Sequence, residues 1–313
     1  MVGIVILNFN SFGLTRDCAE SIFANTVKYP DYHIYIVDNN SKDGSGKELE
    51  DLYRDDNRVT VLFSEKDCGN SEGWNVGARV AVEEKADYVL FLDSDTVLLN
   101  DALSVMLDAF GKDERIRICG PALYDANGNY IQYAGRLYDG VTRLYPMKVI
   151  GPLLSFFTRK KRRIYYDTTK DFIYQGLFSG CCMCIESGFL IEHGFLDENV
   201  VFYHEEDILG YQLKQSDAVS CICADAKVRH LCGASTVKKG AIGATVFRRF
   251  YSWSGALYVL RKYAKTSWLH RKFIELEYRF FWTVLSVLHK EYRIKRKQFK
   301  TEIKKANQKE RDR

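Results

Sequence analysis

No segment of the 313-residue sequence is apolar over the roughly 20 residues that a membrane-crossing helix needs. The most apolar helical stretch, residues 273–289, is interrupted by Glu275, Glu277 and Arg279. The opening residues, MVGIVILNFN, contain no basic region of the kind that begins a secretory signal peptide. We therefore expect a cytoplasmic protein without a membrane-spanning helix.

Internal repeats are also missing, and the nine cysteines show no sign of a disulfide framework. Cys181, Cys182 and Cys184 lie together in one apolar run, which is typical of small buried hydrophobic residues. Reduced thiols are therefore expected, in agreement with a cytoplasmic location.

Acidic residues become scarce toward the C-terminus. Residues 261–313 contain 17 Lys and Arg but only 6 Asp and Glu, whereas residues 1–260 contain 28 and 35. A basic segment after an acidic body indicates a negatively charged partner or a solvated tail. Two interpretations follow: a plain charged tail, or a peripheral helix on an anionic membrane, with basic residues beside Phe280, Phe281 and Trp282. A nucleic-acid partner is not expected.

The N-terminal hundred residues alternate between apolar, β-branched runs and segments compatible with helices. The runs are residues 2–7, 33–37, 59–63 and 88–92, and the helical segments are residues 11–26, 44–54 and 72–85. Continuous hydrophobicity marks strands that are buried on both faces, and this alternation predicts a doubly wound parallel sheet. Further strands are predicted at 116–123 and 172–185, further helices at 186–193 and 205–215, and a helical C-terminal part from about 245.

Polar residues follow each of the first four predicted strands. The carboxyl ends of parallel strands share one edge of a sheet, and ligands bind at that edge. We expect four clusters to converge there: Asn8 with Asn10, Asp38 with Asn40, Asp67 with Glu65, and Asp93 with Asp95.

The pair Asp93 and Asp95, in the segment FLDSDTVL, is the most informative of these clusters. Two carboxylates one residue apart repel each other, and they can bind a hard divalent cation such as Mg²⁺ or Mn²⁺. A structural alternative is capping of the next helix, for which Asn100 or Asp101 is better placed. A chemical alternative is a haloacid-dehalogenase-type phosphatase, whose D-x-D-x-[TV] motif has a nucleophilic first Asp; that motif usually opens its domain, and no downstream G-D-x-x-x-D is present.

Taken in order, several segments of residues 2–235 resemble the family 2 glycosyltransferases, which have the GT-A fold, a Rossmann-like, mostly parallel sheet flanked by helices. These segments are VILNFN, IVDNNSKDGS, DCGNSEGWNVGARVA, LFLDSDT, FSGCCMCI, GFLDENVVFYHEEDILGYQL and VRHLCGAS. Asp67 stands where the family commonly has Asn, and Leu209 stands where a further Asp is often found. The resemblance is closest to the rhamnosyltransferase-like branch.

The resemblance implies a role for each matching residue. It assigns donor binding to the nucleotide-sugar group Asn8, Asn10, Asp38, Asn40, Asp67, Asn75 and Asp93. It implies metal binding by Asp95, Asp93 and His230, a catalytic base at Asp207, and an acceptor side near Gly180 and Glu206. The implied reaction is inverting transfer of a sugar from a UDP- or dTDP-sugar to a glycan or lipid-linked acceptor, in bacterial surface polysaccharide synthesis. Residues 1–235 would form the catalytic domain, and residues 236–313 a basic helical extension.

Structural alternatives stay open for most of these residues. Asp38 can cap its own turn, the acids at 205–207 can favour a helix N-terminus, and His230 can be a hydrogen-bonded buried residue. Core packing is expected for Trp74. Two other classes also remain: a nucleotidyltransferase, although its glycine-rich opening turn is missing, and a binding module without catalysis.

Overall fold

The computed structural model describes residues 1–29, 31–137, 163–231 and 241–288, together with 293, 294, 297 and 301. The chain forms two compact units. The first contains residues 1–136, 164–201 and 205–235, and the second contains residues 137–163, 202–204 and 236–313. Each unit is described by itself below.

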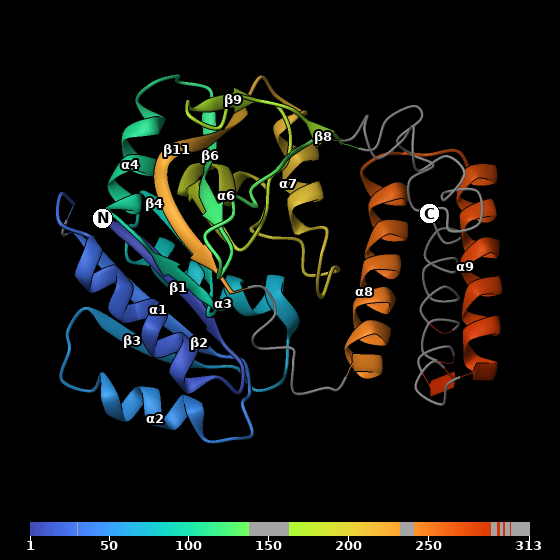
Figure 1. Ribbon diagram of the computed structural model, residues 1–313, viewed down its shortest axis with the longest axis horizontal. Helices are drawn as coiled ribbons and strands as arrows, with labels where there is room; N and C mark the ends of the chain where they lie inside the picture. The colour runs from blue at the N-terminus through green and yellow to red at the C-terminus, as the bar shows by residue number, and fades with distance from the viewer. Residues whose placement is uncertain are drawn as a thin grey trace. The chain divides into compact units, whose positions relative to one another are not determined.

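The first unit is built on a nine-stranded sheet with the order β3-β2-β1-β4-β10-β6-β11-β5, to which β9 adds by pairing with β11 (Figure 1). Its strands are β1 (Val2–Asn8), β2 (Tyr32–Asp38), β3 (Val59–Phe63), β4 (Tyr88–Asp93), β5 (Thr96–Leu98), β6 (Ile116–Tyr124), β9 (Phe172–Tyr174), β10 (Cys182–Glu186) and β11 (Val219–His230). Two short strands, β7 (Ala134–Gly135) and β8 (Arg163–Ile164), form a separate ribbon.

Parallel pairing organises the N-terminal half of the sheet. Strand β1 pairs in parallel with both β2 and β4, and β2 pairs in parallel with β3. Beyond β4 the sheet is mixed: β10 runs antiparallel to β4 and β6, whereas β11 runs parallel to β6. The carboxyl ends of β1 to β4 therefore meet at one edge, as the sequence predicts.

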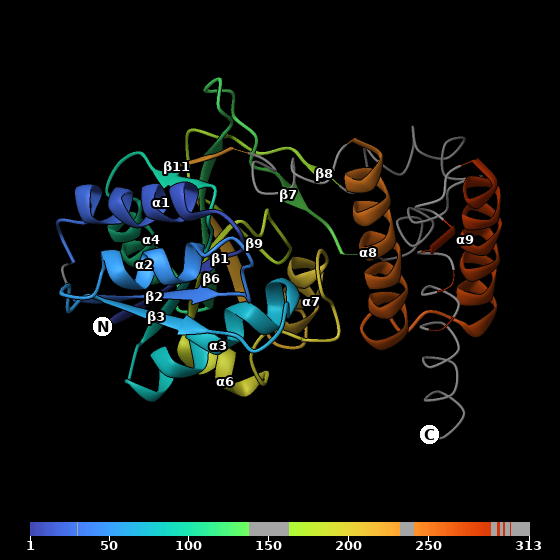
Figure 2. The same ribbon diagram turned by 90° about the horizontal axis from the view of Figure 1, so that it is seen from below.

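Helices cover both faces of this sheet, which confirms the predicted α/β architecture (Figure 2). On one face, α1 (Phe12–Asn25), α2 (Ser45–Leu52) and α4 (Ala102–Phe110) share a core cluster with residues such as Ile4 and Leu92. On the other face, α3 (Gly69–Glu83), α6 (Ser187–Glu192) and α7 (Glu205–Leu213) pack against Val5 and Phe91. Trp74 is buried there, 5.7 Å from the ring of Phe91, which agrees with the core role expected for it.

Several elements depart from the sequence-based prediction. The single strand expected at 172–185 is two strands, β9 and β10, which pair with different neighbours. The sequence did not predict β5 or β11, and it indicated the start of α4 only through its candidate caps, Asn100 and Asp101. β11 is hard to predict because its middle is polar and bulged: the pairing register with β6 shifts between Cys223 and Lys227. Eight cysteines lie in the described residues, and all eight are free thiols.

The second unit contains α8 (Ala241–Lys262) and α9 (Trp268–Leu288), which agree with the helical C-terminal part that the sequence predicts. Aromatic rings join the two helices: Trp253 stacks on Tyr278 at 4.7 Å, and Phe250 meets Trp282 edge-on at 6.0 Å. Among the described helices, none has the length and apolar composition needed to cross a membrane. Most of the basic tail, residues 290–313, lies outside the described residues.

Close contact between β1 and α3 suggests a test of the packing. A Cβ atom at Gly3 would lie 2.3 Å from the Cβ atom of Ala81, so Gly3→Val must push α3 away from the sheet. We expect the free energy of unfolding to fall by about 2–3 kcal/mol, measured by urea denaturation. The matched control is Gly13→Ala, which meets no atom within 4 Å and should stabilise α1 by roughly 0.5–1 kcal/mol. Equal stability of Gly3→Val and the wild type would contradict this packing.

Candidate functional site

The carboxyl end of β4 carries Asp93, and the turn after it carries Asp95. The Thr96 hydroxyl donates a hydrogen bond to the Asp93 carbonyl at 2.7 Å, which closes this turn. Thr96 then begins β5, which pairs antiparallel with the end of β11, so that Thr96 lies opposite His230. The fold thus brings a histidine from residue 230 beside two acids that lie about 135 residues earlier.

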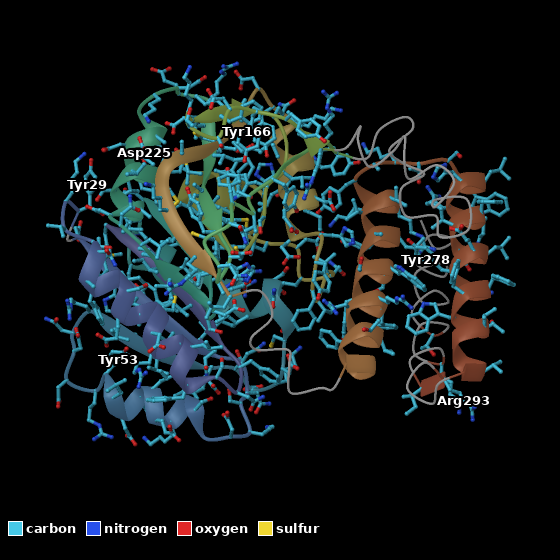
Figure 3. The ribbon with its side chains drawn as sticks, viewed as in Figure 1. Tyr29, Tyr53, Tyr166, Asp225, Tyr278 and Arg293 are labelled. Carbon is cyan, nitrogen blue, oxygen red and sulfur yellow. The ribbon has the colours of Figure 1, made fainter. Side chains whose placement is uncertain are left out.

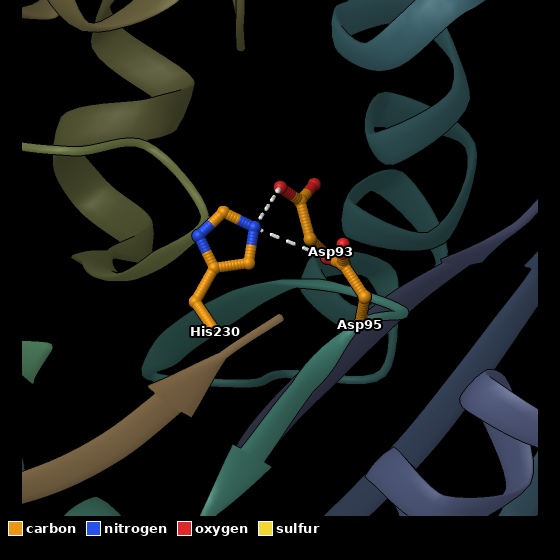
Figure 4. A group of neighbouring side chains, drawn as sticks. All are labelled: Asp93, Asp95 and His230. Carbon is orange, nitrogen blue, oxygen red and sulfur yellow. Dashed lines mark ion pairs between the residues drawn. The ribbon is translucent and has the colours of Figure 1, made fainter. Parts of the chain in front are cut away.

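The three side chains form a compact group at the sheet edge (Figure 4). The Nε2 atom of His230 lies 3.2 Å from Oδ1 of Asp95 and 3.9 Å from Oδ2 of Asp93. Burial and the neighbouring Asp95 carboxylate raise the pKa of Asp93 to about 7. Burial lowers the pKa of His230, but hydrogen bonds to Asp95 and Cys181 outweigh it and raise the pKa to about 11. A nearby positive charge therefore stabilises the acid pair, and the imidazole of His230 can supply it when protonated.

This group fits a divalent metal ion. One ligand atom from each of Asp93, Asp95 and His230 lies within 4.8 Å of the other two. Carboxylate oxygen suits Mg²⁺ and Mn²⁺, and an imidazole nitrogen is more favourable for transition metals such as Mn²⁺ than for Mg²⁺. Helix capping does not explain the pair, because Asp101 caps α4 by accepting from the backbone N–H of Ser104 at 3.3 Å.

A hollow lies against Asp95, on the side of α1. It has a volume of about 440 Å³, and Asp17, Glu20, Ser94 and Arg229 are among its lining residues. Arg229 is adjacent to His230 on β11, and its Nε atom is buried without a hydrogen-bond partner. The sequence analysis did not identify this arginine, because a single cation at a strand end carries no pattern of its own.

Asn8, at the end of β1, is fully buried and is hydrogen-bonded to several residues of the surrounding loops. Its side-chain amide donates to Asp38 at 2.7 Å and to the Ser45 hydroxyl at 3.0 Å. Its carbonyl oxygen accepts from the Thr15 hydroxyl at 2.7 Å. The side chain is fully buried, so its hydrogen bonds position the end of β2.

Asp38 is also buried, and it accepts from the backbone N–H of Ser41 at 3.0 Å, so it caps its own turn as one alternative predicts. Asn10 and Asn40 both have a left-handed backbone, with φ values of 52° and 62°. The side-chain oxygen Oδ1 of Asn10 accepts from the Lys42 N–H at 2.7 Å. These contacts join the loops after β1 and β2 into one ordered rim.

The two predicted donor-binding residues near α3 have clear local contacts. Asp67 is exposed and accepts from the Gly69 N–H at 3.1 Å, at the start of the helix. Asn75 is fully buried: its amide nitrogen donates to the Leu196 carbonyl at 2.8 Å, and its oxygen accepts from the Leu196 N–H at 3.0 Å. Asn75 therefore ties α3 to the loop that leads toward α7.

The second acidic group, Glu205, Glu206 and Asp207, forms the first turn of α7. Glu206 lies beside Gly180: a Cβ atom at that glycine would be 3.6 Å from Cγ of Glu206, so the two predicted acceptor-side residues are neighbours. Glu206 also contributes to the raised pKa of Asp93. The two acidic groups therefore lie within electrostatic range of each other, although more than 100 residues separate them in the sequence.

Glu205 is a site residue to which the sequence analysis gave no role beyond the helix terminus. It is buried, and its Oε2 atom has no hydrogen-bond partner. Burial and the carboxylates of Asp93 and Asp207 raise its pKa to about 7, while hydrogen bonding to Asn70 partly offsets the rise. The Glu-Glu-Asp triplet was the available signal, but a sequence does not show that Glu205 and Asp207 are the buried members of the three.

The second unit includes Phe202–His204, the three residues immediately before α7. Tyr203 and His204 both have positive φ values, 66° and 74°, which is uncommon for residues other than glycine. The His204 ring lies with Nε2 2.8 Å from the Ser252 carbonyl on α8, and there is no room for a Cβ atom at Gly255 beside it. These contacts support a packing role for His204.

Comparison with known proteins identifies the class. Residues 3–185, more than half of the chain, match the sequence profile described as glycosyl transferase family 2. The chain belongs to this family.

Curated relatives align over limited regions. Glycosyltransferase GlyG of Streptococcus pneumoniae is 29% identical over 135 residues, which are 42% of this chain and 43% of that protein. The poly(ribitol-phosphate) beta-N-acetylglucosaminyltransferase TarP of Staphylococcus aureus is 31% identical over 113 residues, 36% of this chain and 33% of TarP. The chain thus matches less than half the length of these relatives.

Solved structures confirm the predicted GT-A fold. GalNAc-T7, solved with UDP, GalNAc and Mn²⁺, matches with a TM-score of 0.56 at 16% identity and covers 74% of this chain and 44% of its own. Residues 1–349 of S. aureus TarS in complex with UDP match with a TM-score of 0.53 at 13% identity, over 87% of this chain and 69% of the other. At these identities the likeness concerns the fold alone.

The contacts of Asn75 predict that its replacement acts on stability. Asn75→Ala leaves the Leu196 N–H and carbonyl buried without partners, so the free energy of unfolding should fall by about 2–4 kcal/mol in urea denaturation. The control is Arg79→Ala, which removes an exposed ion pair with Glu198 and should cost less than about 1 kcal/mol. A stable Asn75→Ala protein with weakened nucleotide binding would instead favour direct contact with the donor.

Glu205 predicts a pH-dependent stability. Its pKa is about 7 in the folded state and 4.5 in a model peptide, so the folded state binds the proton more tightly. The stabilising contribution of Glu205 to the free energy of unfolding is fully present below about pH 4.5 and is lost as the pH rises to 7. Glu205→Gln, which stays neutral, should therefore match the wild type at pH 4.5 and exceed it by about 2 kcal/mol at pH 8. Denaturation in EDTA at both pH values measures this; an equal difference at the two pH values would argue against a raised pKa.

Proposed function

We propose that the protein is an inverting, metal-dependent glycosyltransferase that moves a sugar from a nucleoside diphosphate sugar to a hydroxyl of a glycan or lipid-linked acceptor. The observation that carries this proposal is the Asp93–Asp95–His230 group within electrostatic range of the acids that begin α7. Family membership supports the reaction class.

Asp95, Asp93 and His230 would hold the metal ion, with Asp93 shared between metal and nucleotide. When bound, Mn²⁺ or Mg²⁺ supplies positive charge that offsets the negative charge developing on the departing diphosphate. The loops that contain Asn10, Asp38, Asn40 and Asp67 would surround the nucleotide, because strand-end loops at a switch point in strand order form ligand sites. Asn8 and Asn75 would act by positioning those loops.

Asp207 would be the general base that takes the proton from the attacking acceptor hydroxyl. It is buried in the first turn of α7, and Glu206 and Gly180 beside it would face the acceptor. A single displacement needs a base and a stabilised leaving group but no covalent nucleophile. Inversion at the anomeric carbon follows from such a displacement.

The relatives support the substrate classes. Neighbours of the same fold are solved with UDP, UDP-GlcNAc or UDP with Mn²⁺, which favours a UDP-sugar over a dTDP-sugar. TarP acts on poly(ribitol-phosphate), and a Campylobacter jejuni relative, 24% identical over 129 residues, is a glucosyltransferase acting on a glycan linked to PP-undecaprenol. A surface-polysaccharide role at the inner face of the membrane agrees with both. The rhamnosyltransferase-like branch is the assignment that the sequence motifs favour.

Asp207→Asn tests the base. Transfer should fall by about 10²–10⁴-fold, because the neutral amide cannot accept the proton, while donor affinity stays within a few-fold of the wild type. Released diphosphate, measured over a panel of nucleotide sugars with Mn²⁺, reports transfer, and calorimetric titration reports binding. Asp197→Asn, at a half-buried position where the carboxylate accepts from the Asn199 N–H at 3.0 Å, is the matched control and should keep full activity. Undiminished transfer by Asp207→Asn would exclude it as the base.

Asp95→Asn tests the metal site without relying on turnover. We expect Mn²⁺ affinity, followed by the loss of the free-ion electron paramagnetic resonance signal, to fall at least about tenfold, since a carboxylate ligand becomes a neutral amide. Asp101→Asn, which alters the α4 cap and a hydrogen bond from the Lys28 N–H, should bind Mn²⁺ like the wild type. Equal Mn²⁺ binding by Asp95→Asn and the wild type would refute this ligand assignment.

A further inference from the structure

Helix α9 exposes a continuous apolar stripe. Six of its large apolar residues are each 44–75% exposed: Leu269, Phe273, Leu276, Phe280, Val284 and Val287. Their spacings of three and four residues place all six on one side of the helix. A soluble helix normally turns such a side toward a core, so this stripe is unusual.

The opposite side of α9 is the one that packs within the second unit. Ile274, Tyr278 and Trp282 are fully buried there, and Tyr278 lies on the side of α9 that faces α8 (Figure 3). The stripe is therefore additional to the side that holds the two helices together.

The stripe also revises the membrane contact considered from the sequence. From the sequence, Phe280, Phe281 and Trp282 together form the expected aromatic part of that contact. Only Phe280 is exposed, whereas Phe281 is half-buried and Trp282 is fully buried beside Trp253. The residues available to a partner lie along the whole helix rather than in this short aromatic run.

Positive charge surrounds the stripe. On α9, the carboxylate of Glu275 has three cations nearby, with Lys272 at 3.0 Å, Arg279 at 2.6 Å and Arg261 at 3.9 Å, which leaves a local excess of two charges. Besides Arg261, the sequence adds two basic residues and no acid at 261–267, and residues 289–313 contain 11 Lys and Arg against 4 Asp and Glu. Basic sequence therefore both precedes and follows α9.

We propose that the α9 stripe docks on an anionic lipid surface, with the helix lying in the plane of the membrane interface. An apolar stripe joined to basic residues is the pattern by which helices bind such interfaces, through burial of the apolar side chains and attraction to anionic headgroups. A second copy of the chain would bring two strongly basic regions together, and their repulsion opposes pairing through the stripe. This inference does not depend on the transfer reaction.

Vesicle co-sedimentation of the full chain tests the proposal. The wild type should bind vesicles of phosphatidylcholine with 30% phosphatidylglycerol, and binding to pure phosphatidylcholine should be at least tenfold weaker. Leu276→Glu/Phe280→Glu should reduce binding to the anionic vesicles at least tenfold. The control Val27→Glu/Ile191→Glu changes the charge equally at exposed apolar positions of the first unit and should bind within twofold of the wild type.

Further measurements keep the test decisive. Leu276→Ser/Phe280→Ser repeats it without added charge, and thermal unfolding confirms that each variant folds. Binding of Leu276→Glu/Phe280→Glu to anionic vesicles that equals that of the control Val27→Glu/Ile191→Glu would overturn the proposal. Equal binding of the wild type to neutral and anionic vesicles would also overturn it. A stable dimer in light scattering that the stripe variants dissociate would also overturn it and assign the stripe to a second copy. No donor or acceptor is present, so failure here leaves the proposed transfer reaction untouched.

Discussion

The repulsion between Asp93 and Asp95 is the constraint on which the rest of the site depends. Two carboxylates held one residue apart at a strand end are costly to bury unless a cation meets them. The fold supplies one by ending β11 opposite β5, which brings His230 within 3.2 Å of Asp95. At the same position, a divalent ion can supply the positive charge in place of the proton on the imidazole.

The surrounding elements keep this acidic edge accessible and ordered. The side chain of Asn8 makes its hydrogen bonds to other residues of the protein, and these bonds hold the loops after β1 and β2. Asn75 fixes the segment before α7 to α3. The backbone before the acids of α7 is therefore held in place near the sheet edge. Glu205 adds a further buried carboxyl, whose pKa is raised by burial and by neighbouring carboxylates. Much of the binding geometry thus comes from residues that are themselves buried.

The sequence predicted the parts of the fold that rest on local patterns. Continuous apolar runs identified β1 to β4, and the helices between them followed from the alternation. It did not predict β11, because the strand has a polar, bulged middle, and yet β11 delivers His230. Motif resemblance points to Asp95, Asp207 and His230 as candidates, but a motif does not show which neighbouring side chains are buried. Asn8 and Asn75 are donor-binding candidates by motif, and the structure adds that both side chains are buried and hydrogen-bonded within the protein. The Glu-Glu-Asp triplet marked the region of Glu205 but not its burial, and Arg229 belongs to no motif. The spacing of the apolar residues of α9 can be seen in the sequence. The sequence does not show which side of the helix packs within the second unit.

The central claim is that the two acids and the histidine form one metal site at the sheet edge. The most direct test is a crystal soaked with MnCl₂ and UDP, with data collected at the manganese absorption edge. The account predicts an anomalous peak within ligand distance, about 2–2.5 Å, of Asp95 and at least one of Asp93 and His230, with the diphosphate beside it. Bound UDP with no peak at this position, or with the manganese held elsewhere in the chain, would contradict it.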